Sequence, residues 1–558
     1  MRHPLIVQGK PLGRRRFLQG LAASAASLLL WRPAWAVPGA GVPEMSGNEF
    51  DLVISELAAS YSGKPSRAVT VNSCVPGPLL RWREGDTVTM RVHNTLKADT
   101  SIHWHGLQVP AAMDGVPGLS FHGIAPGASF TYQFPLRQSG TYWYHSHSAG
   151  QEQRGLYGPI IIEPKEPEPF RYDRDYVVML SDWTDDEPEH ILARLKADSS
   201  YYNHHQPTLG DFLRDIRSKG FAAAWAERRQ WAAMRMDPSD RADVSASTYT
   251  YLINGYSSDA NWTAAFRPGE TLRLRFINGA AMSYFDVRIP GLKMTVIAAD
   301  GQAVQPVEIE EFRLAVAETL DVLVQPTQAA HTIFAQSMDR SGYVRATLAS
   351  RRGLEAAVPA LDPPVRLTLD DLGMGGNMAD MDMPMQTHPA SESGNPSVDM
   401  QAMMVMPKLD DPGIGLRNNG RRVLSYANLK SRFADPDGRE PGRTIELHLT
   451  GHMDRYMWSF NGVPFAAAEP LRLHYGERVR ITLVNDTMME HPIHLHGMWS
   501  DMEDEGGNFL VRKHTISVPP GTRRSYRVTA DALGRWAYHC HLLFHMDAGM
   551  FREVRVEA

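Results

Sequence analysis

The chain has 558 residues, of which 22% are charged, and its formal net charge is −6. A basic face is the usual footprint of nucleic-acid binding, so this charge balance gives no reason to expect a nucleic-acid partner. Only two cysteines are present, Cys74 and Cys540, which are too few for a disulfide framework. The length allows about three or four domains of ~150 residues each.

The first 36 residues are predicted to be an export signal. GRRRFLQG leads into an apolar, alanine-rich run, and AWA at 34–36 offers the small residues that a signal peptidase requires. The run of roughly 14 residues is shorter than the ~20 needed to span a bilayer, which argues against a membrane anchor. Arg14 and Arg15 resemble the pair of a bacterial twin-arginine signal. We therefore expect the twin-arginine translocase to export the chain to the periplasm, cleavage after Ala36, and no membrane span in the mature protein.

From about residue 48 onward, short alternating runs broken by Gly and Pro predict antiparallel β structure. Three stretches look alike, each with a Gly turn, an alternating strand and an Asn-containing turn. They cover residues 79–96, 270–289 and 471–496. Their spacing of about 200 residues indicates a tandem array of one β-sandwich type. We therefore predict an all-β fold with domains at 48–166, 172–355 and 436–558.

Two segments interrupt this array. Residues 186–240 carry helical spacing with charged faces, which predicts helices inserted into the middle domain. Residues 356–435 form a predicted Met-rich linker, in which residues 373–406 hold nine of the chain's 27 methionines among Gly, Asp, Ser and Pro. This stretch has no periodicity that could build a core, so we expect a mobile linker or loop.

Four His-x-His pairs occur at the ends of predicted strands. Chance alone gives roughly one such pair at this histidine content, and a single pair is more often a surface or hydrogen-bonded pair than a metal site. Residues two apart on a strand share a face, so each pair can offer two imidazoles to one place. The pairs are His103 and His105 in IHWHG, His145 and His147 in YWYHSHS, His494 and His496 in HPIHLHG, and His539 and His541 in HCH. Together they indicate metal binding.

The last pair encloses Cys540 in the stretch HCHLLFHMDAGM. A buried strand with Cys540 as a small core residue is one interpretation, but it leaves the spacing unexplained. A thiolate, two imidazoles and a distant thioether form the trigonal site that holds electron-transfer copper. By this hypothesis Cys540, His545 and Met550 are three of the four ligands, and the fourth lies elsewhere.

In this order, IHWHG, YWYHSHS, HPIHLHG and HCHLLFHMDAGM resemble the four copper motifs of the multicopper oxidases, over essentially the whole mature chain. The stretches PGPLLRWREGD and MDGVPGLSFHGI and the Met-rich segment resemble, more narrowly, the periplasmic copper-resistance oxidases of bacteria. The resemblance implies three tandem cupredoxin-like Greek-key β-sandwich domains. It also implies four copper ions, one of type 1, one of type 2 and two of type 3.

The resemblance assigns each ligand to a copper. The type 1 (blue) ligands would be His491, Cys540, His545 and Met550, the type 2 ligands His103 and His494, and the type 3 ligands His105, His145, His147, His496, His539 and His541. Each motif divides its histidines between coppers, so we expect the cluster to lie between the first and last domains. The middle domain has none of the motifs and is expected to act as a spacer and wall.

The predicted catalytic residues carry electrons and protons. His539, Cys540 and His541 are expected to pass electrons, because the resemblance implies that the sulfur of Cys540 binds the blue copper while its neighbours bind the type 3 pair. Asp114 matches an acidic position near the type 2 copper in the family, which implies a proton-relay or supporting role. The alternative is a turn-forming Asp before Gly. Phe544 stands where some family members have a Glu for proton delivery, so that route is not assumed.

Methionine thioethers prefer Cu(I), which makes two groups of methionines candidate copper sites. The first group, expected to gather copper ions, is Met374, Met378, Met381, Met383 and Met385. The second group, expected to dock Cu(I) near the blue site with Asp501 and Glu503, is Met488, Met489, Met498, Met502 and Met546. A scattered methionine is otherwise core filler.

We therefore predict a periplasmic multicopper oxidase that couples one-electron oxidation of Cu(I) to reduction of O2 to water, in the service of copper tolerance. Two alternatives stay open: a laccase-type oxidase of phenols or aromatic amines, and a periplasmic protein that sequesters copper without turnover. We expect a monomer, with a copper-delivery protein as a possible further partner.

Overall fold

Alternating burial along the strands builds the sandwiches of this protein. Along β2 (Glu49–Ala59), Phe50, Leu52 and Ile54 are buried, whereas the residues between them are exposed. Successive side chains on a strand point to opposite faces, so this pattern gives a sheet one apolar face and one solvated face. A second sheet then covers the apolar face.

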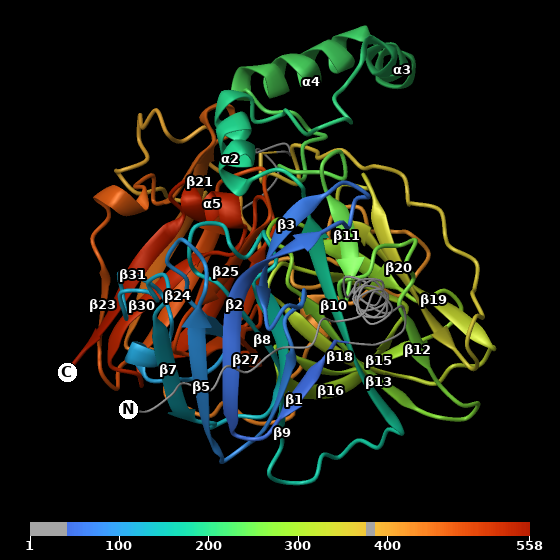
Figure 1. Ribbon diagram of the computed structural model, residues 1–558. Helices are drawn as coiled ribbons and strands as arrows, with labels where there is room; N and C mark the ends of the chain where they lie inside the picture. Colours follow the sequence, from blue (N-terminus) through green and yellow to red (C-terminus); the bar gives the residue numbers. More distant parts are fainter. Residues whose placement is uncertain (1–41, 375–384) are drawn as a thin grey trace, which may run out of the picture. The chain divides into compact units, whose positions relative to one another are not determined.

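The structure, a computed structural model, describes residues 42–374 and 385–558 (Figure 1). The predicted export signal lies outside the described residues, as do Met378, Met381 and Met383. Among the residues that the structure describes, no helix has the length and apolar character needed to cross a membrane.

The first sandwich is drawn in blue and teal in Figure 1. Its elements are β1 (Glu44–Ser46), β2, β3 (Ser66–Val71), β4 (Leu79–Arg83), β5 (Thr87–Asn94), β6 (His103–His105), the 3-10 helix η1 (Ala111–Met113), β7 (Ser129–Pro135), β8 (Gly140–His145) and β9 (Tyr157–Glu163). One sheet has the order β1-β4-β9-β8-β6 and the other β3-β2-β5-β7. In the first, β6 and β8 are antiparallel with His103 opposite His145, which brings two histidine motifs side by side.

The second sandwich is built from two further sheets. Its strands are β10 (Arg174–Trp183), β11 (Thr250–Ile253), β12 (Thr263–Ala265), β13 (Leu272–Asn278), β14 (Phe285–Arg288), β15 (Met294–Ala299), β16 (Gln302–Ile309), β17 (Glu311–Leu314), β18 (Thr319–Val324), β19 (Ala330–Ser337) and β20 (Tyr343–Ala349). The sheet orders are β11-β10-β13-β18-β15-β16 and β12-β20-β19-β14-β17.

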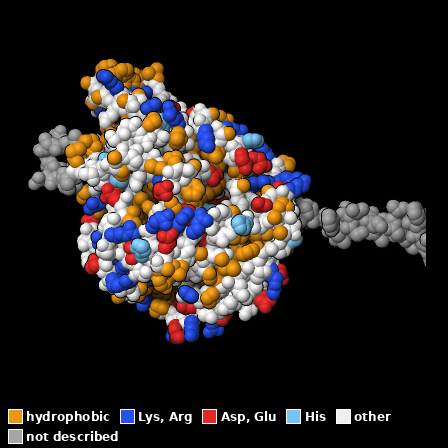
Figure 2. All heavy atoms as spheres, turned by 90° about the vertical axis from the view of Figure 1, so that its left-hand side faces the viewer, with side chains coloured by type: hydrophobic (Ala, Val, Ile, Leu, Met, Phe, Trp, Pro, Cys, Tyr) orange, Lys and Arg blue, Asp and Glu red, His pale blue; other side chains and the backbone are white. Residues whose placement is uncertain are grey.

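Three helices are inserted between β10 and β11: α2 (Pro188–Ala197), α3 (Leu209–Lys219) and α4 (Phe221–Met234). Thr208 and Asp211 form a reciprocal capping box that begins α3. Helices α3 and α4 project away from the strands (Figure 1), and Figure 2 shows hydrophobic side chains gathered on this projecting part. The helical insertion predicted for the middle domain is therefore confirmed.

The third sandwich is drawn in orange and red in Figure 1. Its elements are η2 (Tyr426–Asn428), β21 (Arg443–His452), η3 (Met453–Arg455), β22 (Met457–Phe460), η4 (Phe465–Ala467), β23 (Leu471–His474), β24 (Arg478–Asn485), β25 (His491–Leu495), β26 (Ser500–Glu503), β27 (Phe509–Lys513), β28 (Thr515–Val518), β29 (Arg523–Thr529), β30 (Gly534–Cys540), α5 (Leu543–Asp547) and β31 (Phe551–Glu557). The sheet orders are β22-β21-β24-β29-β26-β27 and β23-β31-β30-β25-β28. β25 and β30 are antiparallel with His494 opposite His539, so the last two histidine motifs are also neighbours.

The all-β architecture of three sandwiches is as predicted, and the domain limits remain a prediction. The sequence predicts a mobile linker or loop for residues 373–406, and its described part, residues 385–406, is a loop that packs against the third sandwich. Met400 and Ala402 are buried there, and the backbone N–H of Asp399 donates to the carbonyl of Gly451 at 2.9 Å. The polar composition concealed this packing, because the apolar partners come from the third sandwich and not from the segment itself.

Candidate metal centres

The predicted blue-copper ligands converge at the end of β30. The Sγ of Cys540 lies 3.6 Å from Nδ1 of His491 and 3.8 Å from Nδ1 of His545, and the two nitrogens are 3.1 Å apart. The sulfur has no exposure to solvent, and burial raises the pKa of the Cys540 thiol well above its usual value. A buried thiolate needs a positive partner, so the thiolate form at this position requires a cation between these three side chains.

Hydrogen bonds to the far sides of both imidazoles fix this orientation. Nε2 of His491 donates to Oγ1 of Thr487 at 2.7 Å, and Nε2 of His545 donates to Oδ2 of Asp243 at 2.8 Å. Trp458 stacks on His545, with ring centroids 3.9 Å apart. Such outer partners select the tautomer whose other nitrogen faces a metal.

Met550, the fourth predicted ligand, is fully buried. Its carbonyl accepts a hydrogen bond from the backbone N–H of Cys540 at 3.1 Å, and its own N–H donates to the carbonyl of His545 at 3.0 Å. The turn after α5 therefore ties Met550 to two of the predicted ligands.

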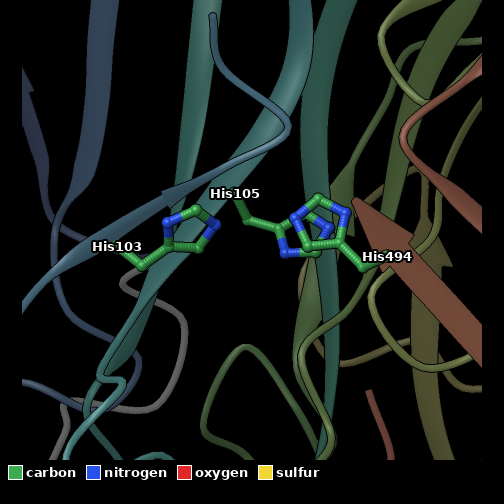
Figure 3. A group of neighbouring side chains, drawn as sticks. All are labelled: His103, His105 and His494. Atoms are coloured by element: carbon green, nitrogen blue, oxygen red, sulfur yellow. The ribbon is translucent and has the colours of Figure 1, made fainter. Parts of the chain in front are cut away.

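His103, His105 and His494 form a second group, and Figure 3 shows their rings pointing toward one another from two parts of the chain. Nδ1 of His103 donates to the carbonyl of Asp114 at 2.8 Å, and Nδ1 of His494 donates to the carbonyl of His514 at 2.6 Å. The Nε2 atoms of His103 and His494 are buried and have no hydrogen-bond partner. Buried polar atoms without partners are rare, so these two nitrogens are suited to a metal.

The remaining histidines form two adjacent groups of three. One joins His105, His145 and His541, the other joins His147, His496 and His539, and within each group the ligand atoms lie within 4.8 Å of one another. Nε2 of His145 is 3.3 Å from Nε2 of His541, and Nε2 of His496 is 3.1 Å from Nε2 of His539. Both groups combine residues of the first and third sandwiches, as expected from the motif order.

Burial keeps these imidazoles neutral. It lowers the pKa values of His105, His145, His147, His491, His494, His496 and His541 well below the usual value. It also lowers the pKa of His539 to about 4. A neutral imidazole is the form that binds a metal. Thiolate, thioether and imidazole donors are together those that suit copper, so the donor set fits the copper centres that the motifs predict.

Two buried carboxyl groups contact the histidines. Oδ2 of Asp114 accepts a hydrogen bond from Nδ1 of His496 at 2.9 Å. Oε2 of Glu152 lies 2.8 Å from Nδ1 of His145, and burial raises the pKa of Glu152 well above its usual value. The position of Asp114 fits a supporting role, which remains a prediction. Phe544 is fully buried and provides no carboxyl group in this region.

Sequence reasoning missed Asp243, Glu152 and Thr487. Asp243 carries no motif and lies 302 residues from His545, so no spacing pointed to it. Its contact corrects the expectation that the middle domain acts only as a spacer and wall. Glu152 follows His147 by five residues, and Thr487 precedes His491 by four. An acid or hydroxyl residue near a motif is a weak signal at best.

Of the methionines expected to dock Cu(I) near the blue centre, Met546 is partly exposed and the other four are not, so a docking role stays a prediction for Met546. Met488, Met489, Met498 and Met502 are all buried in the core. Asp501 pairs with Arg512 at 2.7 Å, and Glu503 pairs with Arg480 at 2.7 Å. These methionines are core residues, and the carboxylates are already neutralised by arginines.

Comparisons with known proteins agree with this arrangement. Three family models described as multicopper oxidase match residues 54–167, 174–353 and 438–558. Copper resistance protein A of Escherichia coli and that of Pseudomonas syringae pv. tomato are each 60% identical, over 98% of this chain and 99% of theirs. Multicopper oxidase MmcO of Mycobacterium tuberculosis is 30% identical over 86% of this chain and 82% of its own.

Solved structures show the same fold. The multicopper oxidase Fet3p, which functions in iron import, superposes with a TM-score of 0.65 and 20% identity over 92% of this chain and 91% of its own. A multicopper oxidase from Campylobacter jejuni, described as a metallo-oxidase, superposes with a TM-score of 0.59 and 21% identity. The match covers 93% of this chain and 95% of its own. The predicted cupredoxin-like character of the sandwiches and the predicted family resemblance are thereby confirmed.

Proposed function

Because this chain belongs to the multicopper oxidase family and is therefore an oxidoreductase, we propose that it oxidises Cu(I) to Cu(II) in the periplasm, reduces O2 to water, and so serves copper tolerance. In the balanced reaction four Cu(I), one O2 and four protons give four Cu(II) and two waters. The resident cofactors would be one type 1, one type 2 and two type 3 coppers. Bound there, copper would accept electrons singly from the donor and deliver them to O2.

The observation that carries this proposal is the position of Cys540. Its sulfur belongs to the group with His491 and His545, while its chain neighbours His539 and His541 each belong to one of the two adjacent histidine groups. A single residue of backbone on either side of the cysteine therefore connects the place where electrons enter to the place where O2 is reduced.

The protein's own residues orient these groups and manage protons. Asp114 holds the proton on Nδ1 of His496 and, through its carbonyl, the proton on Nδ1 of His103. Glu152 occupies the corresponding position against His145. Both carboxyl groups are buried, so bulk water is kept away from the ligands they orient. Because residue 544 is a phenylalanine, we assign proton handling to these two acids.

Support for Cu(I) as substrate comes from the relatives and from the Met-rich segment. The relatives at 60% identity are named copper resistance proteins. Met385, at the boundary of the described part of the segment, is 59% exposed and is therefore not a core residue. An exposed thioether is a soft ligand that prefers Cu(I) over harder ions.

Oxygen uptake tests this proposal with two electron donors, Cu(I) and a simple phenol. Deletion of residues 375–384, which spares the packed residues 385–406, is expected to slow uptake with Cu(I) while uptake with the phenol stays near that of the unmodified protein. Unchanged uptake with Cu(I) would contradict the role of the Met-rich segment. If the phenol alone supports uptake, the laccase-type function is correct instead.

Cys540→Ser separates catalysis from storage. If the protein is an oxidase, this variant should lose its blue colour, its oxygen uptake and its ability to protect cells from copper. Full protection by Cys540→Ser would support the sequestering alternative and contradict the oxidase.

A further inference from the structure

A second type of metal-ligand cluster lies in the third sandwich, outside the centres described above. It consists of His388, Glu392, His448 and Asp486, whose ligand atoms all lie within 4.8 Å of one another. His448 is on β21 and Asp486 directly follows β24, while His388 and Glu392 belong to the packed residues 385–406. The cluster forms only because that segment packs against the sandwich.

The short distances converge on the Nδ1 atoms of the two histidines. Oδ2 of Asp486 lies 2.6 Å from Nδ1 of His448 and 3.2 Å from Nδ1 of His388. Glu392 approaches the same two atoms, with Oε2 3.3 Å from Nδ1 of His388 and Oε1 3.7 Å from Nδ1 of His448. Two nitrogens and two carboxylates thus face a common point.

The ring nitrogens and the carboxylate oxygen that face away from the common point already have hydrogen-bond partners. Nε2 of His388 lies 3.2 Å from the carbonyl of Ala402, and Nε2 of His448 lies 3.1 Å from a carboxylate oxygen of Glu446. The backbone N–H of Ala402 donates to Oδ1 of Asp486 at 2.7 Å. In His388 one ring nitrogen is fixed from outside and the other points inward without a hydrogen bond, as in metal-binding histidines. In His448 the inward Nδ1 is hydrogen-bonded to Asp486, so a bound cation would replace the proton on that nitrogen.

Two inward atoms lack a hydrogen bond, Nδ1 of His388 and Oε1 of Glu392. Oε1 of Glu392 accepts none, although the Glu392 side chain has no exposed surface. With neutral imidazoles the cluster carries a charge of −2, and burying unpaired carboxylates is costly. A divalent cation would balance this charge and complete the coordination of Oε1. Protons on both imidazoles would balance it too, so metal binding has to be measured directly.

We propose that His388, Glu392, His448 and Asp486 bind one Cu(II) ion in addition to the resident coppers. Imidazole and carboxylate are harder donors than thioether, and among divalent first-row ions copper binds such sites most tightly. The site therefore suits the product of Cu(I) oxidation. This assignment of the ion rests on the proposed function.

The chain connects this site to the blue centre. Asp486 is followed directly by Thr487, whose Oγ1 accepts the hydrogen bond from Nε2 of His491. A Cu(II) ion held by Asp486 would lie one residue from a group that orients a blue-copper ligand. The site is thus placed to receive copper that has just given up its electron.

The test uses the copper-loaded enzyme, dialysed against copper-free buffer and titrated with Cu2+ in a calorimeter. We expect one further equivalent to bind and one further paramagnetic Cu(II) to be counted by electron paramagnetic resonance. His388→Gln and Glu392→Gln should each weaken this binding by at least 10-fold, as expected for loss of a ligand. His474→Gln, which changes an exposed histidine of the same sandwich, is the matched control and should bind Cu2+ normally.

Blue absorbance and oxygen uptake with a phenol should be unchanged in all three variants, which shows that the resident centres are intact. The proposal would be overturned if the unmodified protein bound no further equivalent of Cu2+. It would also be overturned if His388→Gln and Glu392→Gln bound Cu2+ as tightly as the unmodified protein. Displacement of the added Cu2+ by an equal concentration of Zn2+ would overturn the assignment to Cu(II).

The same samples distinguish this inference from the proposed function. If Cu(I) supports oxygen uptake but no extra Cu2+ binds, only the additional site is wrong. If the extra Cu2+ binds but Cu(I) supports no uptake, only the cuprous oxidase function is wrong.

Discussion

Asp243 accepts a hydrogen bond at 2.8 Å from Nε2 of His545, a residue 302 positions later in the chain. The bond joins the second sandwich to the proposed blue centre of the third, because Asp243 lies in the segment between the inserted helices and β11. It holds the His545 ring with Nδ1 directed at the sulfur of Cys540. The middle domain, which carries no copper motif, therefore contributes to the geometry of the proposed blue-copper site.

Replacing Asp243 with alanine should weaken the blue centre. Outer partners of metal ligands typically contribute 10-fold to 100-fold in metal affinity, so we expect a loss of about that size for Asp243→Ala. Copper titration of the metal-free protein, followed by the blue absorbance band, measures it. Asp259→Ala, at an exposed position of the same domain, is the control. Equal affinity in the two variants would show that the hydrogen bond does not support the site.

Asp114→Asn should affect the histidine groups where O2 is proposed to be reduced. The amide presents either a competing N–H group or a weaker acceptor to Nδ1 of His496, whereas the carbonyl that holds His103 is retained. We expect oxygen uptake to fall by about 10-fold to 100-fold, with blue absorbance unchanged because Asp114 does not contact that centre. Parallel loss of the blue band would indicate general misfolding and argue against this specific role.

Asp286 is expected to dominate stability where the second and third sandwiches meet. It is fully buried and pairs with Arg313 at 2.8 Å and with Arg340 at 2.7 Å, while Arg313 also reaches Glu490, next to His491, at 3.3 Å. Removing one partner of a buried ion pair costs about 3–5 kcal/mol. Asp286→Asn should lower the free energy of unfolding by this amount in urea titrations, whereas Asp259→Asn should leave it unchanged.

The same residue predicts a pH dependence. Burial alone would raise the pKa of Asp286, but Arg313 and Arg340 hold it below its usual value. The unfolded chain then binds more protons than the folded one in acid, so the stabilisation is present above about pH 4 and is lost as pH falls further. Unfolding free energies measured at several acidic pH values should decline less steeply in Asp286→Asn. Identical slopes would contradict the ionised state of the buried carboxylate.

Export can be tested without any structural assumption. Changing Arg14 and Arg15 together to lysine should leave the enzyme in the cytoplasm, because the twin-arginine pair is the feature that the translocase reads. Cell fractionation with an antibody against the mature chain measures this directly. Normal periplasmic accumulation of the double variant would mean that another export route is used.

The sequence was most informative where ligands recur at short spacing. All eight histidines of the four His-x-His pairs lie in the groups that the structure brings together, since strand geometry turns spacing of two into a shared face. His491 was assigned only by the family resemblance, and the group that holds His388 and His448 was not predicted. Asp243 and Glu392 could not be found in this way. Asp243 acts through a tertiary contact with His545, and Glu392, although four residues from His388, meets His448 only through tertiary packing.

The segment at residues 385–406 shows that tertiary packing also limits what the sequence predicts about the fold. Its Gly, Ser, Pro and Asp content predicted a mobile linker or loop, but Met400 and Ala402 are buried against the third sandwich. Composition describes what a segment can bury by its own pattern. It does not describe the surfaces that the rest of the chain offers to it.

Counting copper together with visible and paramagnetic resonance spectra tests the central claim most directly, because one sample reports on all the centres. After dialysis of the His388→Gln variant, which lacks the proposed additional site, we predict four coppers per chain, an intense blue band, and paramagnetic signals from only two of the four ions. A colourless protein, or one that holds far fewer than four coppers, would contradict the account.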